Sequence, residues 1–149
     1  MQRIEVCSRS LQTTSQEPGL PTIVLDFLHE EITVAELIRR TVEEQVRELQ
    51  VARKLNAGEA RRILNKQYLT QEEVDEQAAA GLVSLPVGTR AGEPDIAIAD
   101  EVRRACRAFK KQAYLIITDG RRMTSLDEKI LFRPGSSVTF IRLIPLIGG

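Results

Sequence analysis

Three side chains could carry nucleophilic or metal chemistry: Cys7, Cys106 and the one histidine, His29. A catalytic thiol needs a histidine or a positive helix terminus beside it, and nothing in the sequence pairs His29, at the end of an apolar stretch, with either cysteine. Three Cys and His residues cannot fill a four-ligand zinc site without carboxylate help. We therefore expect two buried or half-buried thiols and no metal site.

The carboxyl end, "FIRLIPLIGG", offers a different kind of chemistry. A hydrophobic strand that runs into two glycines is either a frayed end or an arm whose terminal carboxylate is the working group. Pro145 cannot donate a ladder hydrogen bond, so we expect the sheet to end there. Leu146 and Ile147 would continue as an extended tail, residues 145–149. Gly148 and Gly149 have no Cβ, which widens the backbone dihedral angles that the tail can adopt.

The composition argues against a nucleic-acid-binding protein and against a membrane protein. The 149 residues fit a single domain, with 42% apolar and 28% charged residues. Lys+Arg and Asp+Glu both number 21, so there is no basic excess to attract nucleic acid or a membrane surface. The sequence lacks an apolar stretch long enough to span a bilayer, and its first residues lack the apolar region of a secretory signal. We expect a cytoplasmic protein that binds neither nucleic acid nor membrane.

The first half of the chain has the pattern of a hairpin followed by a helix. Residues 1–8 and 22–28 alternate between apolar and polar residues, with Pro and Gly turn chemistry between them. Residues 33–55 are predicted to be helical, and Thr33 and Glu36 have the spacing of a capping box. The expected apolar stripe of this helix is Val34, Ile38, Val42, Val46 and Leu49, widened by Leu37 and Ala52.

Residues 57–93 have the character of a helical and loop insertion between better-patterned segments. Thr70 and Glu73 form a second capping-box candidate, and Gly81 could end the helix. A further helix is expected within residues 94–111. Its predicted stripe is Ile98, Val102, Cys106 and Phe109, which makes Cys106 a core residue.

The last forty residues are dense in strand signals. An apolar strand from residue 113 should break at Asp119-Gly120, and a second turn is expected at Pro134-Gly135. Residues 138–146 are strongly β-prone. Because helical segments separate the hairpin from these strands, the first and last strands can pair in parallel at the centre of an α+β arrangement.

These features resemble the ubiquitin-like β-grasp family. "LIITDGRRM" is similar to the ubiquitin strand that ends in a small residue and glycine. The last part of the chain also resembles the small sulfur carriers of molybdopterin and thiamine synthesis. Its matching features are Asp119-Gly120, Leu126-Asp127, Pro134-Gly135, Pro145 and Gly148-Gly149. The resemblance covers residues 1–50, in pattern only, and 95–149, whereas 57–93 matches neither group. It implies a β-grasp mixed sheet packed on a helix, with a helical insertion, most like bacterial ubiquitin-like modifiers.

The resemblance implies a function as substrate and carrier, with no catalytic side chain of its own and no bound cofactor. An activating enzyme would use ATP to adenylate the Gly149 carboxylate, and a conjugating enzyme would pass it as a thioester to amines of target proteins. A deconjugating metallopeptidase would reverse the linkage. Two alternatives stay open: a sulfur carrier with a terminal thiocarboxylate, and an unconjugated β-grasp interaction module. These partners would recognise the tail through Pro145, Leu146 and Ile147.

An exposed sheet face could add a partner surface. Ile117, Ile141 and Leu143 could form an apolar patch there, like that of ubiquitin. The alternative is that they are simply core positions. Because residues 138–144 are apolar on both faces of the strand, their alternation cannot show which face is buried.

Overall fold

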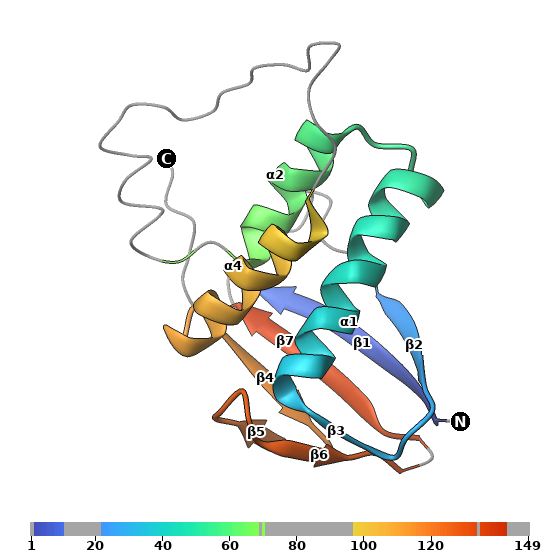
Figure 1. The fold of residues 1–149 in the computed structure, drawn as a ribbon, viewed down its shortest axis with the longest axis vertical. Coiled ribbons are helices and arrows are strands. Elements are labelled where there is room, and N and C mark those ends of the chain that lie inside the picture. Colours follow the sequence, from blue (N-terminus) through green and yellow to red (C-terminus); the bar gives the residue numbers. More distant parts are fainter. Residues whose placement is uncertain (1, 11–21, 69, 71–96, 134, 143–149) are drawn as a thin grey trace.

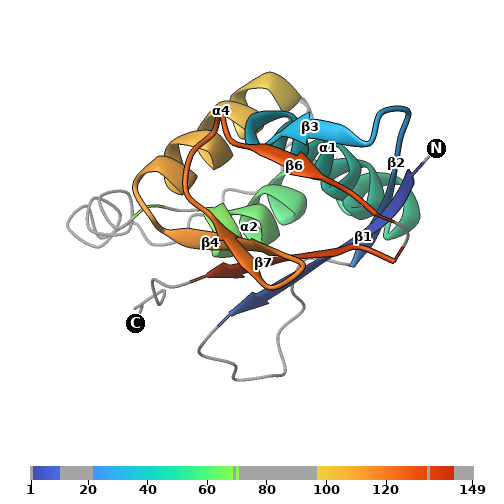
Figure 2. The same cartoon turned by 90° about the horizontal axis from the view of Figure 1, so that it is seen from below.

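In the described part of the chain, a five-stranded mixed sheet carries three α-helices on one face. The computed structural model describes residues 2–10, 22–68, 70, 97–133 and 135–142. In chain order the elements are β1 (Gln2–Ser10), β2 (Ile23–Phe27), β3 (Glu31–Thr33), α1 (Val34–Arg47), a π-helical turn (Glu48–Ala52), α2 (Ala57–Tyr68), α4 (Ile98–Lys110), β4 (Tyr114–Thr118), β5 (Arg121–Met123), β6 (Lys129–Leu131) and β7 (Ser137–Arg142). Figures 1 and 2 show α1, α2 and α4 together above the sheet. The α+β prediction is confirmed.

The sheet has the strand order β2-β1-β7-β4-β5. β1 pairs antiparallel with β2 and parallel with β7, so the predicted hairpin and the predicted central pairing of first and last strands are both confirmed. β7 and β4 are antiparallel neighbours, and β4 pairs with β5. The turn between them lies at Asp119 and Gly120, whose φ angles of 50° and 81° are the left-handed values that this dipeptide accommodates.

A second, two-stranded sheet was not predicted. β3 pairs antiparallel with β6, and the two run side by side next to α1 in Figure 2. The amide of Val34, the first residue of α1, donates to the carbonyl oxygen of Glu128 just before β6 (2.9 Å). The small sheet therefore ties the start of α1 to the connection between β5 and β7.

Helix α1 begins with only half of the predicted capping box. The amide of Glu36 donates to Thr33 Oγ1 (3.1 Å), as expected, but the Glu36 carboxylate pairs with Arg39. The six large members of the predicted stripe are all buried, namely Val34, Leu37, Ile38, Val42, Val46 and Leu49. Ala52 is exposed, against the prediction, because the helix changes to a π-helical turn at Glu48 and rotates later residues off the stripe.

Helix α2 belongs to the core, although it lies in the segment predicted to be an insertion. Ala60, Leu64 and Tyr68 are at most 3% exposed, and α2 packs against α4 and the π-helical turn that follows α1. The expected helix is thus present, but about half of its residues are buried in the core. The predicted Thr70–Glu73 cap and Gly81 cap involve residues outside those described.

Helix α4 is rotated from its predicted orientation, although Phe109 of the predicted stripe is buried and Val102 and Cys106 pack partly buried against the core. Ile98 is 40% exposed and Cys106 is only half-buried at the margin of the core. The buried side is formed by Glu101, Ala105, Ala108 and Phe109. Small alanines allow α4 to approach its neighbours closely, so they set the rotation of the helix in place of the larger Ile98.

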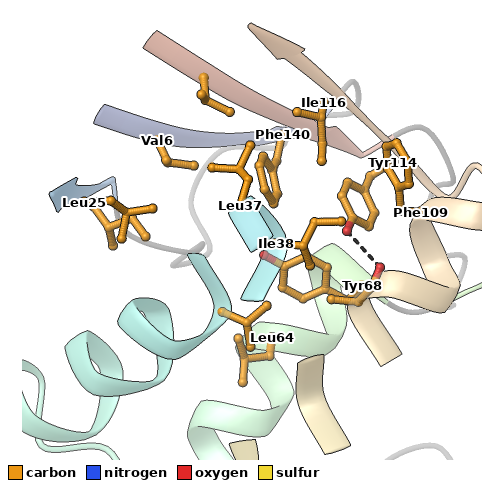
Figure 3. Packing of buried hydrophobic residues seen from close by; sticks show 14 of the residues in the cluster. Val6, Leu25, Leu37, Ile38, Leu64, Tyr68, Phe109, Tyr114, Ile116 and Phe140 are labelled. Carbon is orange, nitrogen blue, oxygen red and sulfur yellow. Dashed lines mark hydrogen bonds between the residues drawn. The ribbon is translucent and has the colours of Figure 1, made fainter. Parts of the chain in front are cut away.

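The core is centred on Tyr114 of β4 (Figure 3). Its ring lies 5.3 Å from Tyr68, 5.9 Å from Phe109 and 5.5 Å from Phe140, measured between centroids. The Tyr114 hydroxyl donates to the carbonyl oxygen of Ala105 (2.8 Å), the dashed line in Figure 3. The Tyr68 hydroxyl donates to Gln45 Oε1 (2.6 Å). The sheet, α2 and α4 are therefore joined by one aromatic cluster whose polar tips are hydrogen-bonded. Among the described residues, no helix is long and apolar enough to cross a membrane.

Candidate functional site

The face of the sheet opposite the helices carries an apolar patch on β4 and β7. On β4 the side chains alternate, with Tyr114, Ile116 and Thr118 buried beneath the helices and the intervening residues half-buried. Leu115 pairs with Ile141 across the β4–β7 ladder, and Ile117 pairs with Thr139, so these side chains share the outer face. We call Leu115, Ile117 and Ile141 the outer-sheet patch.

The structure describes two of the three residues of the predicted patch. Ile117 and Ile141 lie together on the outer face, half-buried and outside the buried core, and their use as a partner surface stays a prediction. Leu143 lies outside the described residues. Leu115 was missed, although its strict alternation with the aromatic Tyr114 and with Ile116 was a usable signal.

Two arginines flank the outer-sheet patch. Arg9 of β1 is the partner of Ile141 in the parallel ladder, and Arg122 of β5 is the partner of Ile117. Both arginines are exposed. An apolar centre with guanidinium groups on two sides suits a protein partner that offers an apolar residue surrounded by carboxylates.

The two cysteines lie on different elements, Cys106 on α4 and Cys7 on β1. Cys106 is half-buried on α4, and this burial raises the pKa of its thiol, although the charge of Lys110 acts in the opposite direction. Cys7 lies on the outer sheet face, where its sulfur is 3.8 Å from a carboxylate oxygen of Glu5 and 3.9 Å from Thr22 Oγ1. Within the described residues no group of three or more His, Cys, Asp and Glu side chains could hold a metal ion.

The predicted tail begins where the described part of the chain ends. β7 runs to Arg142, and its last ladder partners are Ser10 on β1 and Tyr114 on β4. The five predicted tail residues, Pro145, Leu146, Ile147, Gly148 and Gly149, all lie outside the described residues. Their role as the reactive arm stays a prediction.

A cavity of about 450 Å³ lies at the opposite end of β4. Its walls come from the β4–β5 turn, from β6 and from the turn before β7, and they include Thr118, Asp119, Arg121 and Ser136. Thr118 is 4% exposed, and its Oγ1 has no hydrogen-bond partner in the described part of the chain. A buried hydroxyl without a partner costs roughly 1–3 kcal/mol of folding free energy. Sequence reasoning missed this cavity, because no single segment contains its pattern.

Comparisons with known proteins add no assignment to these two surfaces. No protein-family model matches the chain, and searches of curated proteins and of solved structures likewise give no match.

Proposed function

We propose that the chain is a β-grasp protein modifier whose Gly149 carboxylate is activated and transferred to amines of target proteins. The observation that carries this proposal is the central parallel pairing of β1 with β7, between an N-terminal hairpin and β4. Together with α1 on one face, this is the arrangement that the resemblance to ubiquitin-like proteins led us to expect. It places the strand that precedes the tail in the middle of the sheet, where both neighbours hold it.

The proposed chemistry uses the protein as substrate. The Gly149 carboxylate attacks the α-phosphorus of ATP on an activating enzyme, pyrophosphate leaves, and an acyl-adenylate forms. A thiol of the partner enzyme then displaces AMP to give a thioester. An amine of the target finally attacks this carbonyl carbon, releases the thiol and forms an isopeptide bond. Activation is needed because a carboxylate oxygen is a poor leaving group until it is esterified.

The outer-sheet patch favours conjugation over sulfur transfer. A sulfur carrier needs little surface beyond its tail, whereas a modifier is recognised by an activating enzyme, a conjugating enzyme and a deconjugating metallopeptidase. Leu115, Ile117 and Ile141 supply such a surface on a face that the helices do not cover. Helix α2, which lies in the predicted insertion, adds little to this surface, because it buries much of its own surface in the core.

The proposal is tested by reconstitution with a cognate activating enzyme, ATP and a conjugating enzyme. A thioester on the conjugating enzyme, absent when Gly149 is deleted, is the expected result. A terminal thiocarboxylate detected by mass spectrometry, with no thioester, would identify a sulfur carrier. If neither product forms and deletion of Gly148 and Gly149 leaves partner binding unchanged, the protein is an unconjugated interaction module.

A second arm tests the outer-sheet patch. Ile117→Asp should slow thioester formation about tenfold, the effect of losing roughly 1.4 kcal/mol of binding energy. The matched control is Val24→Asp, because Val24 is also an outward apolar residue but lies on β2, away from the patch. Equal slowing by both variants would exclude a specific role of the patch.

A further inference from the structure

The two edges of the five-stranded sheet differ in how they are protected from other chains. In the described part of the protein β2 forms one edge and β5 forms the other. β5 has three residues, and its Arg121 and Arg122 are exposed. Natural proteins commonly prevent edge-to-edge pairing with strands that are short and charged. The β5 edge is therefore protected.

The β2 edge lacks these protective features. Its five residues pair with β1 in continuous register, so no bulge interrupts the strand. Residues 22–28 contain neither a proline nor a basic residue. Figure 1 shows β2 at the margin of the sheet, and β1 is its only partner among the described strands. A regular edge strand of this kind presents main-chain N–H and C=O groups that an added extended chain can match.

Exposed apolar side chains accompany the open edge. Val24 is 50% exposed, because the side chains of β2 alternate and it lies on the face away from the helices. Leu28 follows the last residue of β2 and is 79% exposed, and no large apolar side chain in the described part of the chain is more exposed. An added strand with apolar side chains beside Val24 and Leu28 would remove part of both from water, which favours association.

Asp26, between these two residues, determines which charge fits the edge. Arg3 Nε donates to its Oδ1 (3.1 Å) in a pair whose side chains are both exposed. Arg40 of α1 donates to the main-chain oxygen of Asp26 (3.0 Å) and covers the ring of Phe27, so it does not pair with the carboxylate. No other described residue contacts this carboxylate. A lysine or arginine on an added strand can therefore still pair with Asp26, whereas an acidic residue would meet a like charge.

A second copy of β2 fits this edge less well than a strand with a cation at its centre. An antiparallel pairing that places Val24 against Leu28 of the second copy also places the two Asp26 side chains opposite each other. Like charges directly opposite are destabilising. Antiparallel registers that separate the two carboxylates lose the match of Val24 with Leu28.

We propose that the β2 edge binds an extended segment of a partner protein as an added strand. The segment has apolar side chains beside Val24 and Leu28, and a lysine or arginine opposite Asp26. Main-chain hydrogen bonds supply the affinity of such an interaction, and the alternate side chains supply its specificity. The proposal does not rest on the proposed conjugation chemistry, because β2 shares no residue with the outer-sheet patch or the predicted tail.

The test is an NMR titration of the full chain with the capped peptide Thr-Val-Thr-Lys-Thr-Val-Thr. Its pattern reads the same in both directions, so one peptide serves parallel and antiparallel addition. Saturable shifts are expected at the amides of residues 22–28, and the peptide with glutamate in place of lysine should bind at least about threefold more weakly. Equal binding of the two peptides would overturn the role of Asp26, and absence of saturable shifts would overturn the edge as a binding site.

N-methylated peptides distinguish strand addition from simple apolar contact. In an added strand alternate N–H groups point toward β2 and away from it. Methylation of the amides of one alternate set, either Val-Lys-Val or the threonines between them, should therefore abolish binding, and methylation of the other set should preserve it. Equal binding of both methylated peptides would show that no ladder forms and would refute the proposal.

A lysine on the edge should block the added strand. Val24→Lys should weaken binding of the lysine peptide roughly fivefold or more, through loss of an apolar contact and repulsion between the two lysines. Val51→Lys is the matched control, because Val51 is also an exposed valine, 69% exposed, but lies in the π-helical turn after α1. Equal weakening by both variants would refute a localised site.

Two further measurements test the choice of partner. Asp26→Asn should remove the difference in affinity between the lysine and glutamate peptides, and persistence of that difference would overturn the assignment of Asp26. Without peptide, the amide shifts of residues 22–28 should not depend on protein concentration. A concentration dependence that Val24→Lys removes would overturn the foreign segment in favour of a second copy of the chain.

Discussion

The two tyrosines should make the fold sensitive to alkali. Tyr114 is 0% and Tyr68 is 3% exposed, and both hydroxyls donate within the core. Burial raises the pKa of Tyr68 far above the value of a free tyrosine, against an opposing effect of its hydrogen bond to Gln45. Burial also raises the pKa of Tyr114, and the nearby Tyr68 and Cys106 reinforce this shift. Neither phenolate is compatible with the folded state in mildly alkaline solution.

The sign and size of the effect follow from proton linkage. The unfolded chain loses the phenolic protons at about pH 10, whereas the folded chain keeps them. The free energy of unfolding is therefore unaffected by these groups below about pH 10 and falls as the pH rises further. At pH 11 each tyrosine contributes a loss of about 1.4 kcal/mol, so the pair contributes about 3 kcal/mol. That is a large part of the 5–15 kcal/mol typical of natural domains.

The assay exploits the composition of the chain, which has two tyrosines and no tryptophan. Tyrosinate absorbance should appear only together with the loss of far-UV circular dichroism, in a single transition above pH 10. Tyr68→Phe should remove about half of the pH dependence of the free energy of unfolding, and it also removes the hydrogen bond to Gln45. Tyrosinate absorbance with a midpoint near pH 10 in a protein that keeps its circular dichroism would refute the burial argument.

Two other predictions concern the helices. Leu64→Ala in α2 should lower the free energy of unfolding in urea by about 2–5 kcal/mol, because Leu64 is 1% exposed, while Arg62→Ala on the exposed side should change it by less than about 0.5 kcal/mol. A small effect of Leu64→Ala would mean that α2 is dispensable. Thr33→Ala should cost about 0.5–2 kcal/mol through the lost cap of α1, and Glu36→Gln less than about 0.5 kcal/mol, because Glu36 pairs on the surface with Arg39. Similar losses for both would indicate a complete capping box in solution.

Elements with strict periodicity could be predicted from the sequence, and their burial follows the prediction. The alternation in β1 and β2 and the dipeptide Asp119-Gly120 are local signals with one structural solution. β3 has no such signal, because three residues are too few to alternate and its pairing partner β6 is distant in sequence. The orientation of α4 was mispredicted because packing against its neighbours favoured Ala105 and Ala108 over the larger Ile98.

The two candidate surfaces differ in how far sequence could reveal them. The outer-sheet patch can be predicted from β4, where Leu115 and Ile117 alternate with buried residues. The sequence of β7 alone does not show which of its side chains face outward, and its ladder partners are needed to decide this. The cavity has no sequence signature, because Arg121, Lys129 and Arg133 become neighbours only when two turns and a short strand meet.

The pairing of β1 with β7 has a consequence for biosynthesis. Residues 5–10 find their ladder partners in residues 137–142, so the centre of the sheet can close only after synthesis has passed residue 142. Until then the hairpin and β4 each present an open edge, the kind of edge that recruits other chains. Such distant contacts also slow folding. A nascent or truncated polypeptide that lacks β7 should therefore be a substrate for chaperones and proteases.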